Sequence, residues 1–212
     1  MNPLWQLFQQ NEHDSRFYGP VIGIVTNNKD PDGLGRVKVR FPWLSDTDES
    51  FWARVVTPMA GKQRGMFFLP EVDDEVLVAF EHGEIAFPFI LGALWNGQDT
   101  PPETNQDGKN NLRFIKSRSG HIIRLDDSDD DAKIEIIDNS TKNSITISTK
   151  NNTITISADA DITISSKTGK LKLSGNGVEI SSQAEVKVEA AQNMDLQAGP
   201  QLNIKGSMVN IN

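Results

Sequence analysis

The sequence predicts an all-β protein built as two regions: a small closed barrel, then a repeat that winds with two other copies into a triangular prism. Three observations support this prediction. The aromatic residues and prolines are confined to the first part of the chain, short alternating strands fill that part, and a period of about eight residues runs through the rest. Repeats of this length are typical of stacked or solenoidal architectures.

The boundary between the two regions comes from composition. All ten Phe, all four Trp and the single Tyr lie at or before Phe114, and nine of the ten Pro lie at or before Pro102. One globular domain would share its large core residues along its length. We therefore expect an N-terminal segment at 1–16, a barrel domain at 17–96, a linker at 97–116 and a repeat domain at 117–212.

The barrel domain is predicted from short strands separated by turn residues. Between the first two strands, Asn27 to Gly35 is rich in Asn, Asp, Pro and Gly, which are the residues of a hairpin loop. Several short strands without a helical period favour a small barrel. The expected strands are 21–25, 36–41, 51–56, 65–69, 75–80 and 87–94.

The repeat domain contains ten apolar–polar–apolar triplets, from Ile134-Glu135-Ile136 to Val209-Asn210-Ile211. From the second triplet onward, successive triplets start seven to nine residues apart. Side chains alternate between the two faces of a strand, so each triplet directs two apolar groups inward and one polar group outward. The expected inward residues are Ile145, Ile147, Ile154, Ile156, Ile162, Ile164, Leu171, Leu173, Val178, Ile180, Val186 and Val188.

One octad cannot enclose a core, so the inward residues need other strands to cover them. A lone solenoid of three-octad coils would have only a few coils with both ends exposed. Three chains wound around one axis would close the core along its whole length. The lack of aromatic residues after Phe114 favours this homotrimer, because a narrow three-sided interior has no room for a ring.

Composition also excludes several classes of function. The formal net charge is -8, which argues against binding to nucleic-acid phosphates. There is no Cys, so disulfides and thiolate metal sites are excluded. The N-terminus lacks the pattern of a signal peptide, and no apolar run approaches the ~20 residues of a transmembrane helix. We expect the chain to be made in the cytoplasm.

Three clusters suggest chemistry, but each has a simpler interpretation. The run Asp126 to Asp131 lacks the Gly and distal Glu of a calcium loop and is better explained as a solvated connector. Asp30 and Asp32 fit a hairpin turn better than a metal site. Glu81, His82 and Glu84 have no nucleophile motif beside them, so a loop is favoured over an acid–base pair. We predict no enzymatic activity, no cofactor and no metal.

The ordered motifs of the barrel resemble the spike family of contractile tails, which includes phage baseplate assembly protein V and the VgrG proteins of type VI secretion. The resemblance covers residues from about Phe17 to the C-terminus. It rests on Gly23 to Asn27, Asp30 to Trp43, Trp52 to Val55, Phe68 to Glu71, Asp74 to Val78, Gly92 to Gly97, Ser117 to His121 and Leu125 to Asp127.

This resemblance implies an OB-fold barrel followed by a triple-stranded β-helix. It implies a structural spike that joins a baseplate hub to the tip and pierces the target envelope when the sheath contracts. The expected partners are two further copies of the chain, the hub, the inner tube, a PAAR-type tip protein and, transiently, the target membrane. Only about sixteen residues precede the barrel, so the hub is expected to be a separate polypeptide.

Both ends of the chain carry predicted contacts. Leu4, Leu7 and Phe8 have helical spacing, with Trp5 beside them, and either dock on the hub or cover the chain's own barrel. The uncharged C-terminal strand would leave an apolar opening with unpaired backbone edges, which a tip protein would cap. The residues predicted to bind it are Met208, Val209, Asn210, Ile211 and Asn212.

Alternative functions stay open from sequence. OB barrels often bind single-stranded nucleic acid through aromatic and basic residues, and Phe41, Trp43, Trp52 and Arg54 could form such a face. The acidic charge and the repeat region argue against it. A short VgrG-like type VI secretion spike is a second alternative. A glycan-binding adhesin would expose aromatic residues on its shaft, and the repeat region has none.

Overall fold

The computed structural model describes residues 16–210. It divides the chain into two units, residues 1–157 and residues 158–212. All of the regular structure belongs to the first unit, which contains twelve β-strands and one short 3-10 helix among its described residues. The predicted all-β class is therefore confirmed.

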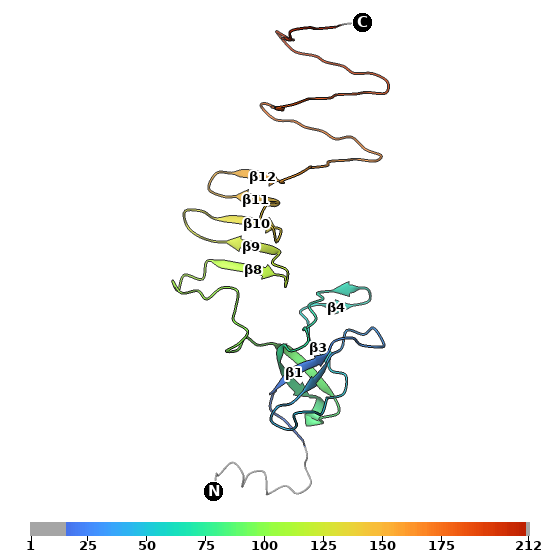
Figure 1. Ribbon diagram of the computed structural model, residues 1–212, viewed down its shortest axis with the longest axis vertical. Coiled ribbons are helices and arrows are strands. Elements are labelled where there is room, and N and C mark those ends of the chain that lie inside the picture. The colour runs from blue at the N-terminus through green and yellow to red at the C-terminus, as the bar shows by residue number, and fades with distance from the viewer. Residues whose placement is uncertain (1–15, 211–212) are drawn as a thin grey trace. The chain divides into compact units, whose positions relative to one another are not determined.

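A curled five-stranded sheet forms the first part of this unit (Figure 1). Its spatial order is β2-β1-β6-β7-β3, and every neighbouring pair is antiparallel except the parallel pair of β3 and β7. The sheet curls far enough for Val37, just before β2, to pair with Ala53, just before β3, through two backbone hydrogen bonds of 2.7 and 3.0 Å. Its strands are β1 (Val21–Asn27), β2 (Lys38–Arg40), β3 (Arg54–Val55), β6 (Glu75–Phe80) and β7 (Pro88–Ala93).

Among the described residues, the hydrophobic core lies inside the curl of this OB-like sheet. The core forms because each strand turns every second side chain to the inside. In strand β6, buried and half-buried residues alternate, as expected for a strand with one covered face. Burying one such Val or Ile side chain stabilises the fold by about 1.5–3 kcal/mol. The buried core residues are Val25, Val37, Val39, Phe41, Ala53, Val76, Val78, Phe80 and Ile90.

A small hairpin interrupts the segment predicted as a strand at 65–69. It pairs β4 (Ala60–Gly61) with β5 (Arg64–Gly65) and ends there. Gly65 has φ 153°, and a Cβ at this position would lie 2.6 Å from the carbonyl oxygen of Met59. The backbone therefore turns where only glycine fits. The 3-10 helix η1 (Glu81–Gly83) follows β6.

A second five-stranded sheet is an antiparallel meander in which each strand pairs with the next (Figure 1). All five residues of each strand are in register with those of its neighbours. Turn residues with positive φ, including Gly120 (φ 100°), Thr141 (φ 60°) and Asn152 (φ 49°), allow the tight reversals. The strands are β8 (Leu112–Lys116), β9 (Ile122–Asp126), β10 (Lys133–Ile137), β11 (Ser144–Ser148) and β12 (Thr153–Ser157).

This meander differs from the expectation of a prism intertwined from its first repeat. The first three triplets lie in β10, β11 and β12 and pair within their own chain. The connections at 138–143 and 149–152 are long enough for each strand to fold back on the one before it. The strand β8 also begins at Leu112, within the segment predicted as linker.

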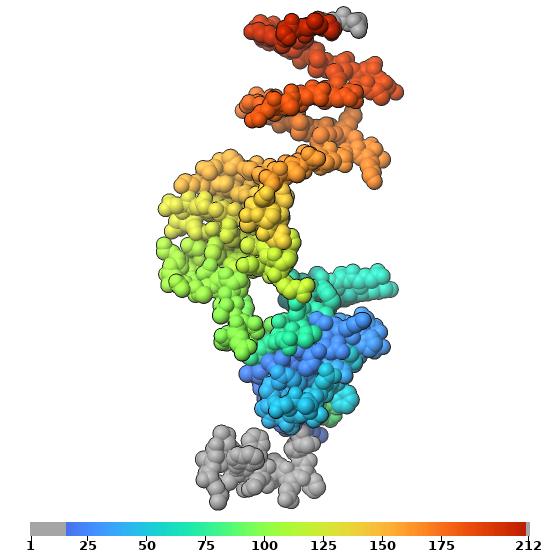
Figure 2. Space-filling model, viewed as in Figure 1, coloured from blue at the N-terminus to red at the C-terminus, as the bar shows by residue number. Residues whose placement is uncertain are grey.

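The second unit has a different character. Residues 158–210 contain no helix or strand and are exposed almost throughout. Figure 2 shows this segment as a single layer of chain that folds back and forth without other segments of its own unit covering it.

Candidate assembly surface

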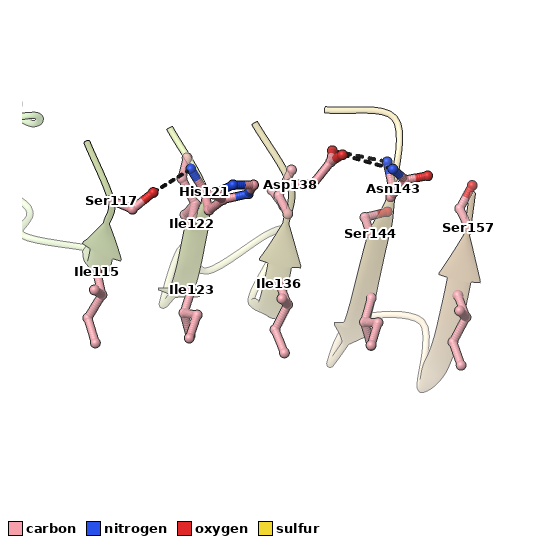
Figure 3. A pocket seen from close by; sticks show the side chains of 13 residues that line it. Ile115, Ser117, His121, Ile122, Ile123, Ile136, Asp138, Asn143, Ser144 and Ser157 are labelled. Carbon is pink, nitrogen blue, oxygen red and sulfur yellow. Dashed lines mark hydrogen bonds between the residues drawn. The ribbon is translucent and has the colours of Figure 1, made fainter. Parts of the chain in front are cut away.

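The meander has one apolar face, built by the alternation of its five strands. The register aligns Ile115, Ile123, Ile136, Ile145 and Ile156 in one row across the sheet. A second row contains four further residues: Leu125, Ile134, Ile147 and Ile154. We call these nine side chains the apolar face. Figure 3 shows that Ile115, Ile123 and Ile136 point to the same side of the sheet.

Nothing in the described chain covers this face. Its members range from Ile145, which is 40% exposed, to Ile154, which is 72% exposed. Contiguous apolar patches of this kind are rare on monomeric proteins and mark interaction surfaces. The four predicted core residues Ile145, Ile147, Ile154 and Ile156 thus lie together on one open face.

A shallow hollow of about 540 Å³ lies over the first row and has a polar rim (Figure 3). The rim comes from the turns at one end of the strands. Asn143 Nδ2 donates to Asp138 Oδ2 at 2.8 Å, and the backbone N of His121 donates to Ser117 Oγ at 3.0 Å. The Ser140 hydroxyl, which donates to Asp138, holds the pKa of that carboxyl below its usual value, and Asn143 lowers it further. These bonds fix the turns and leave the isoleucines accessible.

The reverse face of the meander carries a buried ion pair at its centre. Arg124 Nε donates to Glu135 Oε2 at 2.9 Å, its Nη2 donates to the same oxygen, and Glu135 is only 8% exposed. The Ser128 hydroxyl lowers the pKa of Asp126, and the hydrogen bond to Asp131 raises the pKa of Lys133. The central charges of this face, Arg124 and Glu135, therefore pair with each other.

The remaining predicted core residues lie in the second unit. All are exposed and none has a strand partner within the described chain. They are Ile162, Ile164, Leu171, Leu173, Val178, Ile180, Val186 and Val188.

The predicted end contacts are described only in part. Met208 is 78% exposed and Val209 is 48% exposed, while Asn210 is also exposed. The other predicted tip residues, Ile211 and Asn212, lie outside the described residues. The predicted hub contacts Leu4, Trp5, Leu7 and Phe8 also lie outside them.

The sequence analysis missed the contributions of β8 and β9 to the apolar face. Ile123-Arg124-Leu125 is an apolar–polar–apolar triplet like those that follow it. Its spacing to the next triplet, Ile123 to Ile134, equals the spacing from Ile134 to Ile145, so the signal was present in the sequence.

The loop between β1 and β2 is held by a carboxylate. Asp30 accepts hydrogen bonds from Arg36 Nε at 2.8 Å, Arg36 Nη2 at 2.7 Å and the backbone N of Leu34 at 3.0 Å. The Arg36 guanidinium holds the pKa of Asp30 well below its usual range. Asp32 also pairs with Arg36, at 2.6 Å. These contacts explain the two aspartates through the turn, as the sequence analysis favoured.

The other clusters of the barrel are ordinary loop contacts. His82 has φ 52° in η1, and Glu81 pairs with Arg54 at 3.3 Å on the surface. Across residues 16–210, no three His, Cys, Asp or Glu side chains are grouped so that they could hold a metal ion.

The aromatic residues considered for base stacking do not form one open face. Phe41 is in the core at 4% exposure and packs against Phe80, with ring centroids 5.6 Å apart. Trp43 packs edge-on against Phe17 at 5.1 Å. Trp52 lies beside Lys38, whose Nζ is 5.5 Å from its ring centroid. A buried Phe41 cannot stack on a base.

Comparison with known proteins adds the family context. Residues 21–95 match a family model described as the type VI secretion system/phage-baseplate injector OB domain. The chain is 36% identical over 99 residues to the type VI secretion system spike protein VgrG3 of Vibrio cholerae, which is 43% of this chain and 10% of that protein. It is 36% identical over 92 residues to the spike protein VgrG1a of Pseudomonas aeruginosa, or 40% of this chain and 14% of that protein.

Another relative is named as an actin cross-linking toxin, VgrG1 of Vibrio cholerae, with 36% identity over 99 residues, or 43% of this chain and 9% of that protein. The chain thus spans about a tenth of the length of the curated relatives it matches. Within the described part of the chain, no helix has the length and apolar character needed to cross a membrane. The curled sheet of residues 21–95 is an OB domain of the phage-baseplate and type VI secretion injector family, and the chain is a distant relative of the VgrG spike proteins.

Proposed function

We propose that this chain is the central spike of a contractile tail or phage-tail-like injection system. Three copies form an OB collar and a β-helical shaft, and the shaft pierces the target envelope when the sheath contracts. The role is mechanical and needs no catalytic group or cofactor. The OB domain family and the VgrG relatives support the baseplate context.

One observation carries the proposal. A single chain leaves the apolar face of the meander uncovered and leaves the backbone of residues 158–210 without strand partners. The apolar face of the meander is open, and residues 158–210 form no helix or strand within the described chain. Buried backbone N–H and C=O groups are almost always paired in folded proteins. A strand-like repeat with an apolar side therefore needs other chains to complete its hydrogen bonds and cover its side chains.

Three copies around one three-fold axis would supply both the strand partners and the cover for the apolar side chains. Three apolar faces directed at a common axis enclose a dry core, and three tails wound together supply the missing strand partners. The inward residues are aliphatic, with no aromatic side chain after Phe114, which suits a narrow interior. Backbone hydrogen bonds that run around the shaft would make local unfolding under load costly.

The parts at the two ends are proposals of the same kind. The barrels would join the shaft to a separate hub protein, with Leu4, Trp5, Leu7 and Phe8 as the contact. A tip protein of the PAAR type would cap the three copies of 208–212. The exposed Met208 and Val209 fit an apolar contact of that kind.

The tip proposal is tested by deletion of residues 208–212. Assembled particles carrying the truncated chain should lose the tip protein while they keep the spike. A point variant of the neighbouring tail surface, Lys205→Gln, serves as the control and should keep the tip. Full tip occupancy on the truncated spike would contradict the assignment.

The assembly state tests the central proposal. Light scattering on the purified chain should give about three times the chain mass of 23.5 kDa. A folded monomer that stays monomeric at micromolar concentration would rule out the intertwined spike.

A type VI secretion spike and a phage-tail spike share this architecture. The family model that matches the OB domain is described for both machines and favours neither over the other. Sheath and tube proteins that copurify with the chain would distinguish the two machines.

A further inference from the structure

Two turns at opposite lateral ends of the meander carry opposite charge. At one end, the turn between β8 and β9 is flanked by Lys116 and contains Arg118, with no acidic residue from 116 to 121. At the other end, the segment from Asp126 to Asp131 contains five aspartates and no basic residue. We call these segments the basic turn (116–121) and the acidic turn (126–131).

The topology keeps these turns apart within one chain. They lie at opposite ends of β9, whose five residues span about 17 Å. They cannot form ion pairs with each other inside the chain, although only strand β9 separates them in the sequence. A neighbouring copy is the nearest source of a complementary turn.

Some of these charges already have partners in the chain, and others do not. Asp127 pairs with Arg113 at 2.5 Å and Asp131 with Lys133 at 2.7 Å. Asp129 and Asp130 are exposed and have no ion pair among the described residues, and the same is true of Lys116. Arg118 of the basic turn pairs with Glu71 at 2.7 Å, so the exposed charges without an ion pair in the two turns are Lys116 on one side and Asp129 and Asp130 on the other.

We propose that a second copy of this chain docks along each end of the meander, with the basic turn of one copy beside the acidic turn of the next. This inference rests on the proposed trimer and specifies its subunit contact. Three sheets whose apolar faces point at one axis meet end to end. A three-fold axis then brings the basic end of each sheet to the acidic end of its neighbour, a heterologous contact that closes after three copies.

The charges would specify the direction of the chains. In a parallel arrangement every contact joins opposite charges. An antiparallel neighbour would bring acidic turn against acidic turn, and like charges placed together disfavour the wrong partner. The isoleucine rows cannot make this distinction, since they look alike in both directions.

Crosslinking tests the contact, because the natural chain has no Cys. We would place one cysteine in each turn, Ser119→Cys and Asp130→Cys, in the full-length chain and add a short bismaleimide. The double variant should give covalent dimers and trimers on a denaturing gel, while each single variant should stay monomeric there. Crosslinked dimers from Ser119→Cys alone would mean that like ends meet and would overturn the proposal.

The same samples separate this inference from the proposed function. A trimeric mass in solution with no crosslinks in the double variant overturns the edge contact and leaves the spike proposal standing. A monomeric mass overturns both.

A charge swap tests the ionic component. Lys116→Glu alone or Asp130→Lys alone should lower the trimer fraction at low salt, because each places like charges together at the contact. The two changes combined restore opposite charges with reversed sign and should recover the trimer. Arg118 is left unchanged because its Nη1 also donates to Glu71, at 2.7 Å. If the combined variant loses as much of the trimer fraction as the two single losses added together, the turns do not meet.

Discussion

Residues 112–157 and residues 158–210 use the same apolar–polar–apolar unit, yet one chain folds the first stretch and not the second. In the meander, every strand has an in-chain partner and only the apolar face is left open. In the tail, the described backbone has no strand partner in the chain and the apolar side chains are exposed. The difference shows that the triplet specifies which side is apolar but does not by itself decide whether the next strand pairs within the chain.

The largest expected effect comes from a charge in the tail. Ile164→Asp would place three carboxylates together in the proposed shaft, at a cost of several kcal/mol each. Thr163→Asp changes the adjacent, outward position and should have little effect. Light scattering and thermal unfolding would measure both variants. Equal effects would show that the inward and outward sides of the tail are assigned wrongly.

The second prediction compares amide hydrogen exchange in the two stretches. Tail amides should exchange through dissociation, so their protection should increase with protein concentration. Meander amides have partners in their own chain and should exchange through local opening, with a much weaker dependence on concentration. The same dependence in both stretches would mean that the meander also forms only in the assembled state.

A smaller effect is expected from the polar pair of the meander. Glu135→Gln removes the buried charge that Arg124 pairs with, so the free energy of unfolding should fall by about 1–3 kcal/mol. The matched control is Lys187→Gln in the tail, where Lys187 and Glu189 form an exposed pair at 2.7 Å. Exposed pairs contribute about 0–1 kcal/mol. Chemical denaturation would rank the two changes, and a larger loss for Lys187→Gln would contradict the comparison.

The smallest effect concerns pH and the barrel. The pKa of Asp30 is lowered in the folded state, so the stabilisation from its charged form is present above the ordinary Asp pKa of about 4 and is lost as pH falls below it. The melting temperature of the natural chain should therefore fall as the pH is lowered below about 4. Asp30→Asn should melt at a lower temperature at pH 7 and lose less on acidification, while Asp46→Asn, on the exposed surface, should behave like the natural chain.

The sequence predicted the all-β fold class and the shared face of the apolar residues in the first triplets, because both depend on local alternation. The sides of Ile145, Ile147, Ile154 and Ile156 followed from a period of two. The in-chain pairing of β10 to β12 could not be predicted the same way, because strand partners depend on how the connections turn. The buried position of Glu135 was also missed, since a polar residue on an outer face is expected to be solvated until its Arg124 partner is known.

The number of strands in the meander has a consequence for the length of the proposed shaft. Five strands is an odd number, so the chain enters β8 at one end of the sheet and leaves β12 at the opposite end. Removing or adding one hairpin keeps this exit side and changes the height of the sheet by two strand spacings, about 9–10 Å. Removing one strand would send the chain out on the wrong side. Insertions and deletions in this region should therefore be tolerated in units of two strands, which makes shaft length a quantity that changes in discrete steps.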